Sequence, residues 1–448
     1  MRNGLQMDID PRDVVANARM APFQKRVVAV MIGLNALDGF DVLSISFASP
    51  GIARAWAVER AALGVVLSME LIGMALGALV LGAAADRIGR RRTILTCLCI
   101  MAVGMALAAV SGDIVRLSAC RLLTGLGIGG MLAATNAAVA EVSSTKRRSL
   151  CVVLMAAGYP VGTIIGGMIA TVLLRHFTWP AIFVFGALAT AVFIPLVLRQ
   201  VPESIDFLVG RGGAGAVQDV NAILRRMGHP AIDRLPMHSA HRAKVSPFAL
   251  FDRGIRSATL LLTTAYLGQI MTFYFILKWI PKIVADMGYA PDRAGLVLVW
   301  ASVGGATGAV LLGLASSRLR VLALTLVAAG LSALLVTLFG HEQSALGSLS
   351  MMAALAGTAT NAGVVGLYAL IAERFPTSLR ATATGFVIGI GRGGSALAPA
   401  LAGLLFSIGY GLPAVAAIMS MGSVVAFVAL AALAFVRPAA SPPDHTFV

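Results

Sequence analysis

The chain has 448 residues, of which 58% are hydrophobic and only 12% are charged, and its formal net charge is +15. So few charges exclude an ordinary soluble domain, in which roughly 25% of residues are charged. The positive charge does not indicate nucleic-acid binding, because basic and aromatic residues do not cluster together in any polar segment.

Apolar runs recur along the whole chain, and each is long enough to cross a hydrocarbon core of roughly 30 Å. Runs such as LSMELIGMALGALVLGAAA are apolar on every side, which predicts helices and excludes the alternating strands of a membrane barrel. Six helices are predicted near residues 27–48, 63–84, 93–112, 114–140, 150–174 and 180–199. Six more are predicted near 257–281, 294–316, 321–340, 346–371, 381–408 and 411–436.

The polar stretch at 200–256 separates the first six helices from the second six and contains a short helical candidate at 216–228. Basic residues gather in the loops that face the cytoplasm if both termini lie inside, as the positive-inside rule requires. We therefore expect a multi-pass protein of the inner membrane. Its expected parts are a cytosolic arm at 1–26, a helix bundle at 27–199, a cytosolic loop at 200–256, a second bundle at 257–436 and a cytosolic tail at 437–448.

The two sets of six helices carry traces of an internal repeat at equivalent places. The matching pairs are Gly82 with Asp86-Arg87 against Gly313 with Ser317-Arg318, and Ala140-Glu141 with Arg147 against Ala372-Glu373 with Arg380. Such a repeat is typical of two halves that face each other across a central cavity.

Four charged side chains lie inside the first, second and fourth predicted helices. Asp38 and Asp41 are three residues apart on one face of the first helix, roughly 18 and 22 Å from its start. Arg121 and Glu70 lie roughly 10 and 12 Å from the opposite surface, at about the depth of Asp41. Gly39 lets another backbone or a ligand approach closely. An acid inside the membrane costs at least about 2.5 kcal/mol, so a function or a strong partner must offset it.

Two carboxylates and one arginine cannot all be satisfied as a simple pair, so we expect at least one acid to bind a proton. We assign proton exchange to Asp38 or Asp41, with Arg121 controlling which acid stays charged. The alternative is a static bridge between an aspartate and Arg121 that holds the first and fourth helices together. Glu70 is either a residue of the same pathway or a packing residue at the outer mouth.

Arg392 is an isolated cation about twelve residues into the eleventh predicted helix, roughly 18 Å deep. Its planar fork suits bidentate binding of a carboxylate, so we interpret it as a substrate-binding residue, with a bridge to the first half as the alternative. Lys278 and Trp279 are expected to anchor the outer end of the seventh helix at the membrane surface.

A small organic anion held by Arg392 would also need an apolar slot with a few polar contacts. The candidates for that slot are Phe40, Tyr159, Tyr266, Gln269, Phe273, Tyr274, Trp300 and Asn361.

Several motifs resemble those of a known transporter family. GAAADRIGRRR at 82–92 resembles the signature loop of the major facilitator superfamily. LNALDGFD at 34–41, RLLTGLGIGG at 121–130 and AERFPTSLRATATGFVIGIGRGG at 372–394 are similar to its aromatic acid/proton symporter branch. The resemblance spans all twelve helices and implies an all-α membrane protein of two pseudo-symmetric six-helix bundles. It also implies inward transport of benzoate-like or hydroxybenzoate-like acids with protons, and a functional arginine at Arg392.

The signature loop predicts a conformational latch that breaks when the two halves rock. Asp86 would cap the start of a neighbouring helix while the arginines hold carbonyl groups at helix ends; the alternative is an ordinary positive-inside loop. The predicted latch residues are Gly82, Asp86, Arg87, Gly89, Arg90, Arg91, Glu141, Glu373 and Arg380.

Two further motifs keep other transport functions open. VPESIDFL at 201–208 also resembles the end of the sixth helix in sugar and organic-ion porters, and GYPVGTIIGG at 158–167 partly resembles a motif of drug/proton antiporters. The alternatives to uptake are therefore proton-coupled efflux of a drug or metabolite, a sugar or other organic-anion porter, and a membrane sensor.

The sequence contains no phosphate-binding loop, no HExxH spacing and no nucleophile elbow, which argues against ATP hydrolysis, a metal site and an enzyme. We expect the proton gradient to supply the energy without a cofactor. The expected partners are a small aromatic carboxylate, protons and the lipid bilayer, with no nucleic acid. We expect the functional unit to be a monomer that works by alternating access.

Overall fold

The computed structural model describes residues 10–213, 215–235, 247–252, 254–341 and 345–436, and all the regular structure in these ranges is helical. Twelve of the described helices are long and apolar enough to cross a membrane. The first six are α2 (Pro22–Trp56), α3 (Arg60–Ile88), α4 (Arg90–Ala109), α5 (Ile114–Val142), α6 (Arg148–His176) and α7 (Pro180–Gln200). The second six are α10 (Arg256–Asp286), α11 (Pro291–Ala315), α12 (Val321–Phe339), α13 (Leu346–Arg374), α14 (Thr377–Ser407) and α15 (Leu412–Leu433). The predicted all-helical fold with twelve membrane spans is confirmed.

Several helices run further than their apolar cores predicted. α2 begins at Pro22, where a proline costs no hydrogen bond, and continues through Pro50 to Trp56. α10 likewise continues through Pro281 to Asp286, five residues beyond its predicted end. Membrane helices tolerate an internal proline when neighbouring groups satisfy the freed backbone carbonyl, so the proline does not mark the end of either helix.

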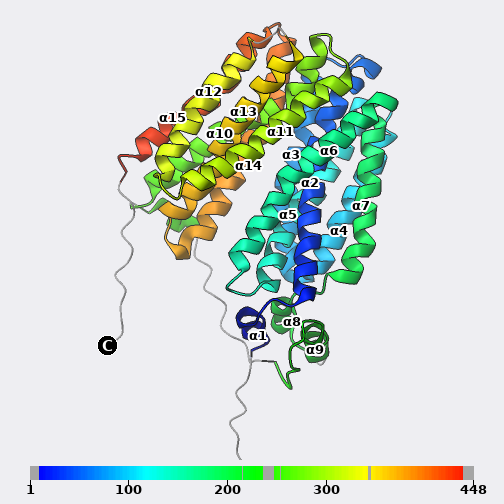
Figure 1. Cartoon of the computed structure of the whole chain (residues 1–448), viewed down its shortest axis with the longest axis vertical. Helices are drawn as coiled ribbons and strands as arrows, with labels where there is room; N and C mark the ends of the chain where they lie inside the picture. The colour runs from blue at the N-terminus through cyan, green and yellow to red at the C-terminus, as the bar shows by residue number, and fades with distance from the viewer. Residues whose placement is uncertain (1–9, 214, 236–246, 253, 342–344, 437–448) are drawn as a thin grey trace, which may run out of the picture.

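Four short helices lie outside these spans: α1 (Pro11–Asn17), α8 (Ile205–Arg211), α9 (Ala216–Arg226) and the 3-10 helix η1 (Pro247–Phe251). α9 matches the helical candidate at 216–228, whereas α1, α8 and η1 were not predicted. In Figure 1, α1, α8 and α9 gather below α2–α7, at the end of the molecule that we call the linker end. The opposite end is called the far end. The amide of Thr145 donates to the carbonyl of Ala16 at 2.8 Å, which ties α1 to the α5–α6 loop.

The helices form two groups, α2–α7 and α10–α15, that lie beside each other in Figure 1. Glycines let helices within each group touch backbone to backbone. A Cβ atom at Gly39 of α2 would lie 2.2 Å from the carbonyl oxygen of Tyr159 in α6, so no larger residue fits there. Gly39 therefore serves the close approach of α6.

Contacts between the two groups join their far ends. Arg60 of α3 pairs with Asp286 of α10 at 3.0 Å, and Arg175 of α6 pairs with Asp292 of α11 at 3.1 Å. Gly64 of α3 packs directly against the backbone of α14, because a Cβ atom there would lie 2.5 Å from a carbonyl oxygen of that helix. In Figure 1 the two groups of ribbons meet at the upper end and diverge toward the linker end. The structure is thus closed at the far end.

Candidate functional site

A cluster of fully buried charges lies between the two groups of helices. The Arg121 guanidinium of α5 forms an ion pair with the Glu70 carboxylate of α3, and both side chains are 0% exposed. The second carboxylate oxygen of Glu70 lies 3.1 Å from the Lys278 Nζ of α10, which is also 0% exposed. Lys278 donates further to the carbonyl oxygen of Val42 in α2. Glu70 thus receives one cation from each half of the protein.

Asp41 joins this cluster through its main chain. Arg121 Nη2 donates to the Asp41 carbonyl oxygen at 2.9 Å, whereas both carboxylate oxygens of Asp41 are buried without a hydrogen-bond partner among the described residues. Oδ1 of Asp38, one turn earlier on α2, is also buried without a hydrogen-bond partner among the described residues. A buried carboxylate that lacks a partner is expensive in its charged form, and a bound proton removes most of that cost.

The alternative prediction, a static ion pair between an aspartate and Arg121, names the wrong acid. The carboxylate paired with Arg121 is Glu70, so the bridge joins α3 to α5 and not α2 to α5. Arg121 also places a nitrogen 3.0 Å from the sulfur of Met105 and stacks over the Phe183 ring. Asp41 and Glu70 were predicted at similar depths, and depth alone could not tell which acid pairs with Arg121.

Lys278 and Trp279 do not anchor the membrane surface, contrary to the prediction. Their side chains are 0% and 1% exposed, and Trp279 Nε1 donates to the Pro399 carbonyl of α14 at 3.1 Å. The cause is the length of α10. This helix continues for eight residues after Lys278, roughly 12 Å, before it ends at Asp286.

Arg392 of α14 lies within electrostatic range of a group of tyrosines from both halves. Its partly buried guanidinium has no hydrogen-bond or ion-pair partner among the residues that the structure describes. It interacts electrostatically with Tyr159 of α6 and with Tyr266 and Tyr274 of α10. Tyr274 also interacts electrostatically with Glu70, which links the tyrosine group to the buried charges.

Tyr368 of α13 belongs to the same group but was not predicted. Its hydroxyl lies 3.0 Å from the hydroxyl of Tyr266, and it interacts electrostatically with Tyr274. The sequence offered no signal beyond one more tyrosine in an apolar helix.

The remaining slot candidates lie elsewhere. Phe40 packs edge to face against Phe185 inside the first half, and Gln269 is buried against the Thr360 carbonyl of α13 inside the second half. Asn361 donates to the Gly305 carbonyl at 2.7 Å.

Two other candidates can be placed as well. Trp300 is 50% exposed on the outer face of α11, where it lines a groove with Leu346 and Met351. Phe273 stacks edge to face on Tyr274 and so lies beside the tyrosine group.

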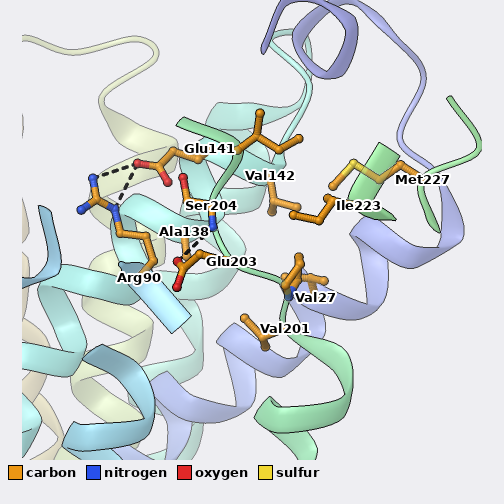
Figure 2. Close-up of a pocket in the computed structure, with 12 residues that line it drawn as sticks. Val27, Arg90, Ala138, Glu141, Val142, Val201, Glu203, Ser204, Ile223 and Met227 are labelled. Carbon is orange, nitrogen blue, oxygen red and sulfur yellow. Dashed lines mark hydrogen bonds and ion pairs between the residues drawn. The ribbon is translucent and has the colours of Figure 1, made fainter. Parts of the chain in front are cut away.

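The linker end carries the predicted latch, part of which is drawn in Figure 2. Arg90 at the start of α4 pairs with Asp86 at 2.6 Å and with Glu141 of α5 at 3.1 Å. Arg91 donates from its side chain to the Leu198 carbonyl near the end of α7. An arginine therefore holds a helix-end carbonyl, as predicted for this loop.

Asp86 does not cap a neighbouring helix in this structure. Its carboxylate is 75% exposed and accepts from Arg90, four residues on in the chain. The start of α4 is instead capped by Glu203, which lies after α7 and whose Oε1 accepts a hydrogen bond from the amide of Arg91 at 3.1 Å. Gly89, with φ of 102°, makes room, because a Cβ atom there would lie 2.4 Å from the Glu203 carboxylate.

The other predicted latch residues are placed as follows. A Cβ atom at Gly82 would lie 3.2 Å from the Cβ of Ala133 in α5. Arg87, Glu373 and Arg380 are exposed.

Glu203→Ala is expected to destabilise the folded transporter by about 1 kcal/mol, because it removes the carboxylate that caps α4. Thermal unfolding of the purified protein in detergent measures this change. Glu59→Ala is the matched control, since Glu59 precedes α3 without capping it through its side chain. Equal unfolding temperatures for the two variants would show that the Glu203 cap contributes nothing.

Within the described part of the chain, no group of three or more histidine, cysteine, aspartate or glutamate side chains could hold a metal ion. Among the buried acids, Glu70 pairs with Arg121 and Lys278, whereas both carboxylate oxygens of Asp41 and Oδ1 of Asp38 have no hydrogen-bond partner among the described residues. The site is therefore one of ion pairs and aromatic rings.

Comparison with known proteins decides the family. The model of the Major Facilitator Superfamily matches residues 31–289 and 259–447. The chain belongs to the Major Facilitator Superfamily. This membership confirms the resemblance seen in the sequence and makes the chain a multi-pass membrane transporter rather than an enzyme.

Similar members of the superfamily are named for aromatic acids. The chain is 28% identical to a gallate transporter of Pseudomonas putida over 437 residues, which cover 97% of each protein. It is 30% identical to the 4-hydroxybenzoate transporter PcaK of Pseudomonas aeruginosa, over 87% of this chain and 88% of that relative. Within the superfamily, the chain falls in the aromatic acid transporter family.

The fold is similar to a solved superfamily structure. The xylose transporter XylE of E. coli, in a partially occluded inward open conformation, matches with a TM-score of 0.71. The match has 17% identity and covers 93% of this chain and 100% of that one. At this identity the likeness concerns the fold alone.

Proposed function

We propose that this superfamily member takes up a small aromatic carboxylic acid, such as a hydroxybenzoate, together with protons across the inner membrane. The observation that carries the proposal is the guanidinium of Arg392, which has no hydrogen-bond or ion-pair partner among the described residues and interacts electrostatically with Tyr159, Tyr266 and Tyr274. A guanidinium binds a carboxylate through two parallel hydrogen bonds, and tyrosine rings offer an apolar slot with polar edges. The names of the relatives support the same class of substrate.

Proton coupling is proposed for the buried acids. Asp38 and Asp41 hold carboxylate oxygens with no partner among the described residues, and Glu70 shares Arg121 with the Asp41 carbonyl. Arg121 can therefore favour the charge of one acid at a time. A proton that enters this layer neutralises the other acid, and its return to solution on the other side completes the transfer.

The proposed orientation rests on the basic residues. Arginine and lysine side chains crowd the linker end around 87–92 and 146–148, and the positive-inside rule therefore supports a cytoplasmic position for that end. The far end then faces outward, and the structure is a state closed to the outside. We assign 27–199 and 257–436 as the two bundles that rock, with 1–26, 200–256 and 437–448 in the cytosol.

The proposed cycle is alternating access by a monomer, with no cofactor beyond the proton gradient. In the state open at the far end, Arg392 binds the substrate carboxylate while the acids of α2 and α3 take up the proton. The far ends then close as Arg60 meets Asp286 and Arg175 meets Asp292. Substrate and proton leave at the linker end.

Purified transporter in proteoliposomes tests this function. Under an imposed gradient, acidic outside and alkaline inside, a panel of labelled aromatic acids is offered to the vesicles. We expect at least one hydroxybenzoate to accumulate above its external concentration, and a protonophore to abolish that accumulation. If every acid fails to accumulate and a lipophilic dye is extruded instead, the protein is an efflux antiporter and the proposal is wrong.

A further inference from the structure

Glu70 and Lys278 form an ion pair that joins the two halves out of contact with solvent. Glu70 lies in α3 of the first half and Lys278 in α10 of the second, and both are 0% exposed. Two other ion pairs join the halves in the described part of the chain, and their arginines, Arg60 and Arg175, have side chains 44% and 53% exposed. Water can replace those partners when the far ends separate. A buried lysine that loses its carboxylate needs a new anion.

Four groups make up one charge cluster, which we define as Asp41, Glu70, Arg121 and Lys278. They are joined by the Arg121 contacts to Glu70 and to the Asp41 carbonyl, and by the contact between Lys278 and Glu70. The groups that face Glu70 are Arg121 from α5, Lys278 and Tyr274 from α10, Tyr159 from α6 and Asp41 from α2. Asp38 faces Asp41 but makes no hydrogen bond or ion pair with the cluster among the described residues.

The charge of this cluster depends on what it carries. Two carboxylates and two cations sum to zero when the transporter is empty. One proton alone gives +1, one monoanion alone gives −1, and both together give zero again. Because a net charge buried inside a membrane protein is costly, only the empty form and the doubly loaded form can close and reorient readily.

We propose that Lys278 is a substrate-binding residue: a proton on the Glu70 and Asp41 pair frees its ammonium group, which then binds the carboxylate of one monoanionic substrate. This inference rests on the proposed uptake function and specifies its coupling as one proton per monoanion. The position fits this role, because Tyr274, one turn before Lys278 on α10, interacts with both Glu70 and Arg392. The substrate thus passes from the lysine near the far end to the tyrosine group and Arg392.

The charge balance predicts different defects for the two partners. Lys278→Gln leaves a cluster that is neutral only with a proton alone, so neither its empty form nor its doubly loaded form reorients, and uptake of the aromatic acid should fall at least about tenfold. Binding of the acid to the purified variant should weaken about tenfold, the effect of losing one ionic contact to the carboxylate. Glu70→Gln leaves a cluster that is neutral only with the anion alone, so it should exchange acid across the membrane without a proton but give no net uptake.

A pH-sensitive dye inside the proteoliposomes and a labelled hydroxybenzoate outside measure net uptake, and vesicles preloaded with unlabelled acid measure exchange. Lys282→Gln is the matched control, since Lys282 lies one turn further along α10 and pairs with Asp286 at the far end. This control should bind and take up the acid as the wild type does. Wild-type affinity and wild-type uptake in Lys278→Gln would overturn the proposal.

The double variant Glu70→Gln with Lys278→Gln tests the proposal even if the single variants misfold. Its cluster is neutral both when empty and when doubly loaded, so it should fold and regain proton-coupled uptake while its affinity for the acid stays about tenfold below that of the wild type. A purely structural pair would instead give the double variant the affinity of the wild type, which overturns the proposal. If the wild type itself takes up no aromatic acid, the proposed function fails; if the wild type takes it up and Lys278→Gln does so equally, only the present inference fails.

Discussion

Replacing Asp41 by asparagine is expected to abolish the gradient-driven accumulation of the aromatic acid, with a loss of at least about tenfold, equivalent to 1.4 kcal/mol of coupling. The amide has the shape of the acid but cannot take up a proton, so the transporter can no longer draw on the pH gradient. Because both Asp41 carboxylate oxygens lack hydrogen-bond partners, the substitution breaks no side-chain hydrogen bond among the described residues, and the protein should keep its thermal stability. Uptake of the labelled acid into proteoliposomes, with and without an imposed gradient, measures the loss.

Asp113→Asn is the control for this experiment. Asp113 is an exposed acid that caps α5 at the far end, and its asparagine variant keeps a side-chain oxygen for the same cap. It should accumulate the acid as the wild type does. Undiminished accumulation by Asp41→Asn would remove Asp41 from the coupling mechanism and leave Asp38 or Glu70 to carry the proton.

Replacing Arg392 by lysine is expected to raise the KM for the aromatic acid roughly tenfold, and replacement by glutamine to raise it further. Lysine keeps the positive charge but loses the planar fork that grips both carboxylate oxygens. Arg392 has no ion pair to lose among the described residues, so a weaker interaction must concern the substrate. Initial rates of uptake over a range of acid concentrations give the KM, while the maximal rate reports on the rocking step.

Arg318→Lys serves as the matched control, because Arg318 lies exposed in the turn between α11 and α12. Its KM should equal that of the wild type. If Arg392→Lys also keeps the wild-type KM, recognition of the carboxylate lies elsewhere, and Lys278 becomes the first place to look.

The helices could be predicted closely because the bilayer imposes both their length and their apolar character. The ends of the helices were harder to predict. Pro281 coincided with the end of an apolar run, yet α10 continues to Asp286. That error of five residues hid the role of Lys278, which was placed at the membrane surface when it lies inside the protein.

The shared depth of the buried charged residues could be predicted from the sequence, but the acid that pairs with Arg121 could not. Asp41, Glu70 and Arg121 were expected at one level, and the structure brings all three together. Which carboxylate takes the arginine depends on how α3 and α5 rotate against each other. Helices that are apolar on every side give no amphipathic signal for that rotation. Trp300 was misplaced for the same reason, since its helix does not reveal which face meets lipid.

The latch shows a different limit. The signature loop indicated that charged residues there would contact helix ends, and Arg91 does so. The cap of α4 comes from Glu203, more than a hundred residues away in the chain, within a motif whose role the sequence alone could not assign. Spacing predicts contacts within one helix, whereas contacts between distant segments require the packed structure.

The most direct test of proton-coupled uptake is the proton flux that the substrate itself causes. Proteoliposomes hold a pH-sensitive dye and start with no gradient, and an unlabelled hydroxybenzoate is added outside at fixed pH with the membrane potential clamped at zero. We predict that the interior acidifies as the acid enters, with one proton for each monoanion, and that Asp41→Asn does not acidify. Entry of the acid anion into wild-type vesicles with no acidification would contradict symport.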